Sequence, residues 1–296
     1  MPRRPLLLLA ALPLLLAACG GDDAAGGDGP RIVATTTQLA DMARNIAPEA
    51  DVTSLLKPNT DPHDYEVRPD DVKALARADI VLRSGGEVDE WLGGALDSAG
   101  VDEQDVVDAG AAAGMEGDDP HWWQDPVRAQ KAVAEIGAAM RRAGLPERAA
   151  AYVERLRKLD EGVRACLDRV PAEDRKLVTS HDALGYFADR YGIEVVGTVI
   201  PSLSTSAQPS AGEVTALVET IKRTGVKTIF AESSVNPKVE RAIADESGAR
   251  VGAELWADSL GPQGSDGETY IGSIAANARA LADGFSGGAV DCRVDA

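Results

Sequence analysis

Residues Pro126 to Leu167 separate two halves of the chain and read PVRAQKAVAEIGAAMRRAGLPERAAAYVERLRKLDEGVRACL. It carries two helical patterns without a strand signal, broken only around Gly144 and Pro146. Pro126 suits the first position of a helix, where its missing N–H has no partner to lose. The stretch predicts two helices almost head to tail; alternatively its second part, residues 147–169, is one long helix that connects two lobes.

Strands and helices alternate on both sides of this stretch. The expected strands cover residues 31–36, 52–56, 80–83, 106–107, 176–179, 194–199, 228–231 and 250–255. The expected helices cover residues 38–46, 70–78, 183–191, 211–223, 239–247 and 270–282. Such alternation is typical of parallel sheets flanked by helices. We therefore predict an α/β protein with one lobe over residues 31–125, a helical linker over 126–170 and a second lobe over 171–296.

The N-terminus has the pattern of a secretory signal. Two arginines precede the apolar run 6–16, which is shorter than the about 20 residues that span a bilayer. The run ends in Leu-Ala-Ala-Cys19, which resembles a bacterial lipobox. We expect residues 1–18 to be removed, Cys19 to carry a lipid anchor and residues 19–30, rich in Gly and Asp, to form a flexible tether. The alternative is an ordinary cleaved signal with a chance cysteine.

Charge and cysteine content narrow the function classes. The 48 acidic residues outnumber the 30 basic ones, giving a net charge of −18. Nucleic-acid binders show the opposite bias, so we expect no nucleic-acid partner. If Cys19 is lipidated, Cys166 and Cys292 remain as an even pair in a compartment that permits disulfides. A bridge between them and two free buried cysteines are both open.

The chain has three histidines, and each follows a candidate strand in a polar loop: His63, His121 and His181. In open α/β sheets ligands bind outside the carboxyl ends of the strands, so a cleft between the lobes could gather all three. Each also has a simpler interpretation. His63 could be a turn residue, His121 could stack on a neighbouring tryptophan, and His181 could stand at a helix start beside Ser180.

Neutral imidazole suits zinc, and a carboxylate commonly completes the set of ligands. By position the carboxylate candidates are Asp258, which follows the last expected strand, and Glu232, which follows the strand before it. Either could instead cap a helix or occupy a turn.

Four segments resemble a known family. They are TDPHDYEVRPD at 60–70, DPHWWQDP at 119–126, TSHDALGYF at 179–187 and LWADSLG at 255–261. In order and spacing they are similar to the metal-type solute-binding lipoproteins of ABC importers, and the resemblance covers residues 31–282. It implies a metal site in the interlobe cleft with His63, His121, His181 and Asp258 as ligands, and Glu232 supporting a ligand from behind. It also implies two lobes bridged by one long helix with limited closure, a membrane permease as partner, and a monomer.

The resemblance also bears on the metal. Family members that take manganese often replace the third histidine with a carboxylate, whereas this chain keeps His181, so we expect Zn²⁺ with Mn²⁺, or mixed specificity, as the alternative. Many zinc members carry a histidine-rich loop before the second motif, and residues 110–119 contain no histidine. An accessory role for that loop is therefore not expected.

Other functions fit less well. A secreted zinc hydrolase would keep a coordination position open for water, and neither a His-Glu-x-x-His nor a Gly-x-Ser-x-Gly motif occurs. We expect no enzymatic activity. A binding protein for a chelated metal or corrinoid would need a larger apolar or cationic pocket. A surface-adhesin role could coexist with metal capture and leaves no test in the sequence.

Overall fold

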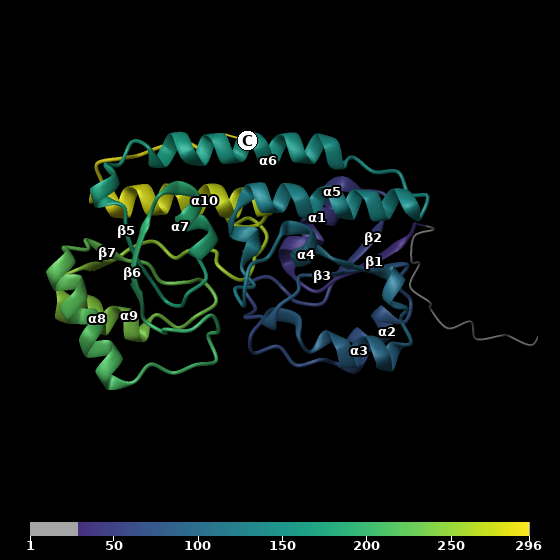
Figure 1. Ribbon diagram of the computed structural model, residues 1–296, viewed down its shortest axis with the longest axis horizontal. Coiled ribbons are helices and arrows are strands. Elements are labelled where there is room, and N and C mark those ends of the chain that lie inside the picture. The colour runs from purple at the N-terminus through teal and green to yellow at the C-terminus, as the bar shows by residue number, and fades with distance from the viewer. Residues whose placement is uncertain (1–28, 296) are drawn as a thin grey trace, which may run out of the picture.

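The computed structural model describes residues 29–295, in which two lobes lie side by side beneath a shared layer of helices (Figure 1). The expected signal and Cys19 lie outside the described residues. The N-terminal lobe is built on a four-stranded sheet with the order β2-β1-β3-β4, in which every pair is parallel. Its strands are β1 (Arg31–Ala34), β2 (Asp51–Ser54), β3 (Ile80–Arg83) and β4 (Val106–Asp108). Its helices are α1 (Thr37–Ile46), α2 (Pro69–Leu75), α3 (Leu92–Ala99) and α4 (Ala109–Ala113).

The C-terminal lobe repeats the parallel arrangement with shorter strands. It holds β5 (Lys176–Thr179), β6 (Glu194–Thr198), β7 (Thr228–Ile229) and β8 (Arg250–Val251), with helices α7 (Gly185–Tyr191), α8 (Ala211–Thr224) and α9 (Lys238–Ser247). The ladders β5–β6 and β7–β8 are joined where the Phe230 N–H donates to the Val178 carbonyl oxygen at 2.9 Å. A further parallel bridge pairs Glu232 with Leu255, beyond the ends of β7 and β8.

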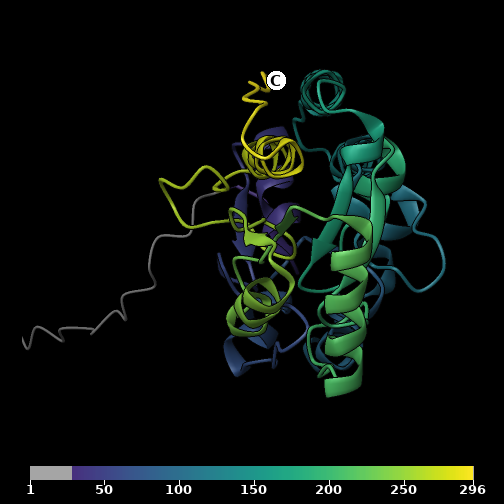
Figure 2. The same cartoon turned by 90° about the vertical axis from the view of Figure 1, so that its left-hand side faces the viewer.

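Three long helices cover both lobes, and we call them the helical layer: α5 (Pro126–Arg142), α6 (Ala149–Leu167) and α10 (Tyr270–Ser286). Figure 1 shows α6 along the top, with α5 below it over the N-terminal lobe and α10 below it over the C-terminal lobe. Seen from the end in Figure 2, α6 and α10 lie above the sheet of the C-terminal lobe. Four 3-10 turns complete the described elements: η1 (Glu87–Asp89), η2 (Glu103–Asp105), η3 (Trp122–Gln124) and η4 (Ala172–Asp174).

Capping residues in the sequence set the ends of helices in this layer. The Asp125 side chain accepts the Val127 N–H at 2.8 Å, and Pro126 occupies the first turn of α5, where its missing N–H removes no bond. Thr269 caps α10 in the same way through the Gly272 N–H, and Gly287, with a φ of 68°, ends it in the left-handed region. The predicted α/β fold, two lobes with parallel sheets bridged by a long helix, is confirmed.

Strand residues alternate between two cores, because successive side chains point to opposite faces of a sheet. In β1, Ile32 packs toward the helical layer and Val33 toward α2 and α3; in β3, Leu82 and Val81 divide in the same way. A sheet buried on both faces is the usual environment of parallel strands. The strands are therefore fixed in register, which places their carboxyl ends at one edge of each lobe.

The chain end returns over α6. Cys292, in the tail after α10, is paired with Cys166 of α6 in a disulfide, with the Cα atoms 5.4 Å apart. Both cysteines are buried.

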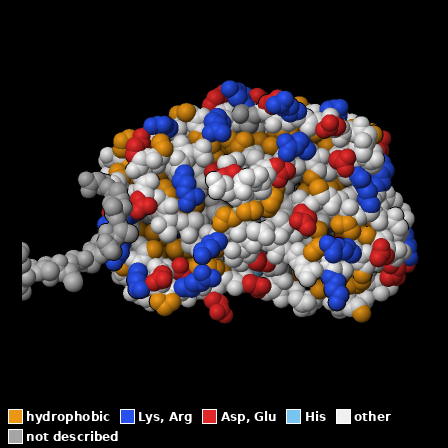
Figure 3. All heavy atoms as spheres, turned by 180° about the vertical axis from the view of Figure 1, so that it is seen from behind, with side chains coloured by type: hydrophobic (Ala, Val, Ile, Leu, Met, Phe, Trp, Pro, Cys, Tyr) orange, Lys and Arg blue, Asp and Glu red, His pale blue; other side chains and the backbone are white. Residues whose placement is uncertain are grey.

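The surface shown in Figure 3 carries acidic and basic side chains interspersed with one another. The negative net charge is thus spread over this face and does not gather into one patch. Among the described residues, no helix is both long and apolar enough to cross a membrane.

Candidate metal centre

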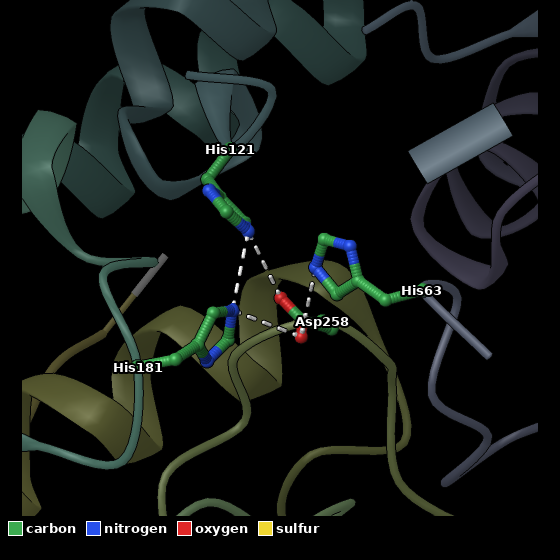
Figure 4. Close-up of side chains that lie close together, drawn as sticks. All are labelled: His63, His121, His181 and Asp258. Atoms are coloured by element: carbon green, nitrogen blue, oxygen red, sulfur yellow. Dashed lines mark hydrogen bonds and ion pairs between the residues drawn. The ribbon is translucent and has the colours of Figure 1, made fainter. Parts of the chain in front are cut away.

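Four side chains from both lobes converge on one point (Figure 4). His63 lies in the loop between β2 and α2, and His121 directly precedes η3 at the entrance to α5. His181 follows β5, and Asp258 lies beyond β8 in the chain that leads to α10. Three of these positions follow strands of the two sheets, as expected for ligands at the carboxyl ends of parallel strands. His121 differs, because α4 separates it from β4.

The donor atoms face one another at close range. Asp258 Oδ2 lies 3.3 Å from His181 Nε2 and 3.7 Å from His63 Nε2, and Asp258 Oδ1 lies 3.4 Å from His121 Nε2. The Nε2 atoms of His121 and His181 are 3.4 Å apart. Donors around a tetrahedral ion with bonds of about 2.0–2.2 Å stand roughly 3.3–3.6 Å apart. With one donor atom taken from each residue, all four atoms lie within 4.8 Å of one another, so the cluster approaches the dimensions of a single four-coordinate metal site.

The burial of these atoms calls for a partner. All four side chains have zero solvent exposure. Within residues 29–295, both ring nitrogens of His63 and both carboxylate oxygens of Asp258 lack a hydrogen bond. Buried polar atoms without partners are rare, because their lost hydration is uncompensated. A bound cation would give a partner to His63 Nε2 and to the Asp258 carboxylate, so the residues present fit a metal ion.

His181 is held from behind by Glu232. One carboxylate oxygen of Glu232 accepts the His181 backbone N–H at 3.0 Å, and the other lies 2.7 Å from His181 Nδ1. Such a partner fixes the ring orientation and leaves Nε2 free for a metal. The structure thus places Glu232 behind the cluster and Asp258 inside it.

His121 has an equivalent partner that sequence analysis missed. Asp119 Oδ1 accepts the His121 backbone N–H at 3.0 Å and lies 2.8 Å from His121 Nδ1. The available signal was the tripeptide Asp-Pro-His, which occurs twice, at 61–63 and at 119–121. An aspartate two residues before a histidine can form an Asx turn that returns its carboxylate to that residue.

His63 lacks such support. Glu87 Oε1 lies 3.7 Å from His63 Nδ1, on a side chain that is 46% exposed. His63 also directly follows Pro62 in its loop, and Pro58 lies four residues before that. Of the three imidazoles, this one is oriented least by its own lobe.

The charges of the cluster balance one another. Burial disfavours the ionised carboxylate, but the imidazoles of His181 and His121 hold the pKa of Asp258 well below its usual range. Burial also disfavours imidazolium, yet Asp258 and Glu232 together raise the pKa of His181 to about 10. Burial lowers the pKa of His63, and the neighbouring imidazoles act in the same direction. In the ion-free cluster the neighbouring carboxylates therefore raise the pKa of His121 and His181, whereas the pKa of His63 is lowered.

The simpler interpretations of the histidines can now be judged. His63 is indeed a turn residue, since its N–H donates to Asp61, and the His121 ring lies edge-on to Trp123 at 5.3 Å between centroids. Both roles coexist with membership of the cluster. The interpretation of His181 as a helix start is wrong, because α7 begins only at Gly185 and the Ser180 hydroxyl donates to Glu240.

Comparison with known proteins agrees with this geometry. Residues 32–284 match the family described as zinc-uptake complex component A, periplasmic. The manganese-binding lipoprotein MntA of Bacillus subtilis is 34% identical over 268 residues, covering 83% of this chain and 87% of that protein. The zinc-binding protein TroA of Treponema pallidum is 33% identical over 267 residues, covering 84% and 86%. The solved structure of TroA superimposes with a TM-score of 0.79 at 28% identity, covering 87% of this chain and 99% of that one.

A buried set of imidazole and carboxylate donors between two α/β lobes defines a metal-binding solute receptor. The chain belongs to the zinc-uptake complex component A family of periplasmic proteins. It is the substrate-binding protein of a metal ABC importer and not an enzyme, which confirms the expected absence of catalysis.

Proposed function

We propose that this protein captures Zn²⁺ outside the cytoplasm with His63, His121, His181 and Asp258 as its four ligands, and delivers it to a membrane permease. The observation that carries the proposal is the fully buried cluster of three imidazoles and one carboxylate, whose oxygens have no hydrogen-bond partner. Three nitrogen donors and one oxygen donor suit zinc, which accepts four ligands at tetrahedral positions. Because four protein atoms fill this shell, the site binds an ion without activating water.

Manganese is the second candidate, and one observation favours it. Asp258 turns both oxygens toward the cluster, Oδ1 toward His121 and Oδ2 toward His181. Bidentate binding would add an oxygen donor, which suits a harder ion. Relatives of comparable identity are named for manganese as well as for zinc.

The test is metal analysis of stripped protein after reloading under zinc–manganese competition at buffered free concentrations. We expect bound zinc with an absorption-edge spectrum of four-coordinate N₃O geometry. Zinc outranks manganese at most sites of this kind, so the free-ion concentrations must resemble those outside the cell. A site that holds manganese under these conditions would overturn the assignment of zinc.

Ligand roles are tested by single substitutions. His63→Ala, His121→Ala and His181→Ala should each weaken zinc binding by more than the 10–100-fold effect of losing a supporting residue. Circular dichroism should stay unchanged. Lys57→Ala, an exposed position in the loop that carries His63, is the matched control and should bind as the unaltered protein does. Zinc affinity that survived all three histidine substitutions would refute the ligand set.

The anchor is part of the proposal. Similar proteins are named lipoproteins, and the sequence around Cys19 resembles a lipobox. Cys19→Ser should move the protein from the membrane fraction to the soluble extracytoplasmic fraction. Retention in the membrane would argue for another mode of attachment.

A further inference from the structure

Two of the three histidines lie on separate turns of the same kind. Asp61-Pro62-His63 and Asp119-Pro120-His121 have the same sequence, and in both the aspartate Oδ1 accepts the histidine N–H at 3.0 Å. Because the turns match, their remaining contacts reveal how the two ligand positions differ.

The turn at His121 is fastened by buried bonds. Asp119 Oδ1 also engages His121 Nδ1 at 2.8 Å. Two residues farther on, Trp123 Nε1 donates to the Ala257 carbonyl at 2.9 Å, and Gln124 Nε2 donates to the same oxygen at 2.7 Å. Ala257 directly precedes Asp258, so His121 and Asp258 keep a fixed relation beneath the helical layer.

The turn at His63 is also fastened across the cleft, but there its own aspartate makes the contact. Asp61 Oδ2 accepts the Thr205 hydroxyl at 2.7 Å, and Thr205 lies 144 residues away in the loop 199–210 between β6 and α8 of the C-terminal lobe. The next hydroxyl, Ser206 Oγ, lies 3.1 Å from Asp64 Oδ1 and 3.4 Å from the His63 carbonyl oxygen. The carboxylate of Asp61 thus shapes the His63 turn with one oxygen and contacts the opposite lobe with the other.

The same loop meets the C-terminal lobe a second time. The Asn59 N–H donates to the Leu260 carbonyl at 2.9 Å, and the Thr60 N–H donates to Ser259 Oγ at 3.2 Å. These contacts lie next to Asp258. The position of His63 therefore depends on two segments of the other lobe. In the part of the chain that the structure describes, His63 Nδ1 has no hydrogen bond that would hold the ring.

We propose that Asp61 and Thr205 form an interlobe latch that keeps His63 on the bound ion. Because the position of His63 depends on this contact between the lobes, His63 is the ligand that departs first when the metal leaves. The proposal rests on the function proposed above and assigns positioning roles to two residues that do not touch the ion. Loss of the Thr205 bond loosens the His63 turn, whereas the contacts of His121, His181 and Asp258 are unchanged. An ion left with three ligands dissociates faster.

The experiment measures zinc release from the full-length, zinc-loaded protein after mixing with excess chelator. Thr205→Val removes the hydroxyl and preserves the branched shape. We expect about tenfold faster release. A tenfold change corresponds to about 1.4 kcal/mol, which is near the lower end of what a hydrogen bond to a charged group contributes. Thr205→Ser keeps the hydroxyl and should restore the original rate. Thr215→Val removes a hydroxyl that bonds only within α8, to the Ala211 carbonyl, and should leave the rate unchanged.

The outcomes separate the latch from the proposed function. Tight zinc binding with the same release rate in Thr205→Val and the unaltered protein would overturn the latch and leave zinc capture intact. Faster release in Thr205→Val and Thr205→Ser alike would also overturn it, because the hydroxyl would then be irrelevant. Failure of the unaltered protein to retain any divalent ion would overturn both proposals.

Discussion

His121 and His181 each point Nδ1 at a carboxylate, at 2.8 Å from Asp119 and 2.7 Å from Glu232. The two acids differ in setting: Glu232 is buried, whereas the Asp119 side chain is 24% exposed. A buried anion interacts more strongly with imidazole than one that water screens. The support for His181 should therefore matter more than the support for His121.

Replacing these acids tests that difference. Glu232→Gln and Asp119→Asn should weaken zinc affinity by roughly 10–100-fold, because each imidazole loses its anionic acceptor, with the larger loss at Glu232. Competition titration against a chromophoric chelator measures both losses. Glu254→Gln changes an exposed acid outside the cluster and should have no effect. Unaltered affinity in Glu232→Gln would show that the contact does not orient His181.

Protons compete with the metal at the same atoms. The raised pKa of His181, about 10, means that its imidazole is protonated at neutral pH in the ion-free cluster. Zinc binding must displace that proton, so apparent affinity falls as pH falls, by about tenfold per pH unit for each proton displaced. Calorimetric titration at pH 7.5 in buffers of different ionisation enthalpy should show release of at least one proton per ion. Zinc binding without proton release would contradict this account of His181.

The sequence predicted the cluster because the chain has three histidines and each of them follows a candidate strand in a polar loop. It left the carboxylate open between Asp258, attractive by position, and Glu232, its competitor, since both follow strands of the same lobe. The resemblance then implied Asp258. The difference is one of side-chain direction: both carboxylates lie close to His181, but Glu232 faces Nδ1 and Asp258 faces Nε2. Linear spacing contains no information about which ring nitrogen a distant acid meets.

At the scale of elements, the long helices and the strands of the N-terminal lobe were predictable. Helix α3 was not, because LGGALDSA contains two glycines that disfavour helix. It forms because Leu92 and Ala95 pack into the core beneath the sheet. The strand expected at 250–255 is regular only over Arg250–Val251, since its partner β7 is equally short. The formation of α3 and the length of β8 both depend on tertiary contacts, which the local sequence does not indicate.

The tail after α10 is an element that stability measurements can test. The pairing of Cys166 with Cys292 closes a loop with a sequence separation of 126 residues. A bridge of this kind restricts the unfolded chain and stabilises the fold by about 2–4 kcal/mol. In the Cys19→Ser protein, the added substitution Cys292→Ser should lower the unfolding free energy in urea by that amount. Zinc affinity should persist, because the bridge joins α6 to the chain end and not to the cluster.

Thiol labelling gives an independent check of the same bridge. Unreduced, denatured Cys19→Ser protein should show no free thiol, because Cys166 and Cys292 are its other two cysteines. Two labelled thiols per chain would refute the bridge. Reduction before labelling is the positive control.

At the scale of the whole molecule, the helical layer limits how far the lobes can move. One continuous buried core includes Leu156 and Val163 of α6, Ile136 of α5 and Leu281 of α10, and it reaches into both sheets through Ile32 and Leu177. Opening the cleft by a large rotation would expose part of this core, at about 25 cal/mol for each Å² of apolar surface. Small sliding of packed helices, by about 1–2 Å, preserves it. Metal exchange should therefore rely on local movement of the His63 loop.

Distance measurement between the lobes tests this limit. Spin labels at Lys73 on α2 and Lys222 on α8 occupy exposed positions on opposite lobes. We expect their separation to change by only about 1–2 Å on zinc binding, as for shear between packed helices. A second label pair, Glu66 with Lys222, reports on the His63 loop. It should show the broader distance distribution in the ion-free protein, because the His63 ring is then not held by an ion. A shift of the Lys73–Lys222 pair by a full helical turn, about 5.4 Å, would mean that the lobes rotate as rigid bodies and that the helical layer does not restrain them.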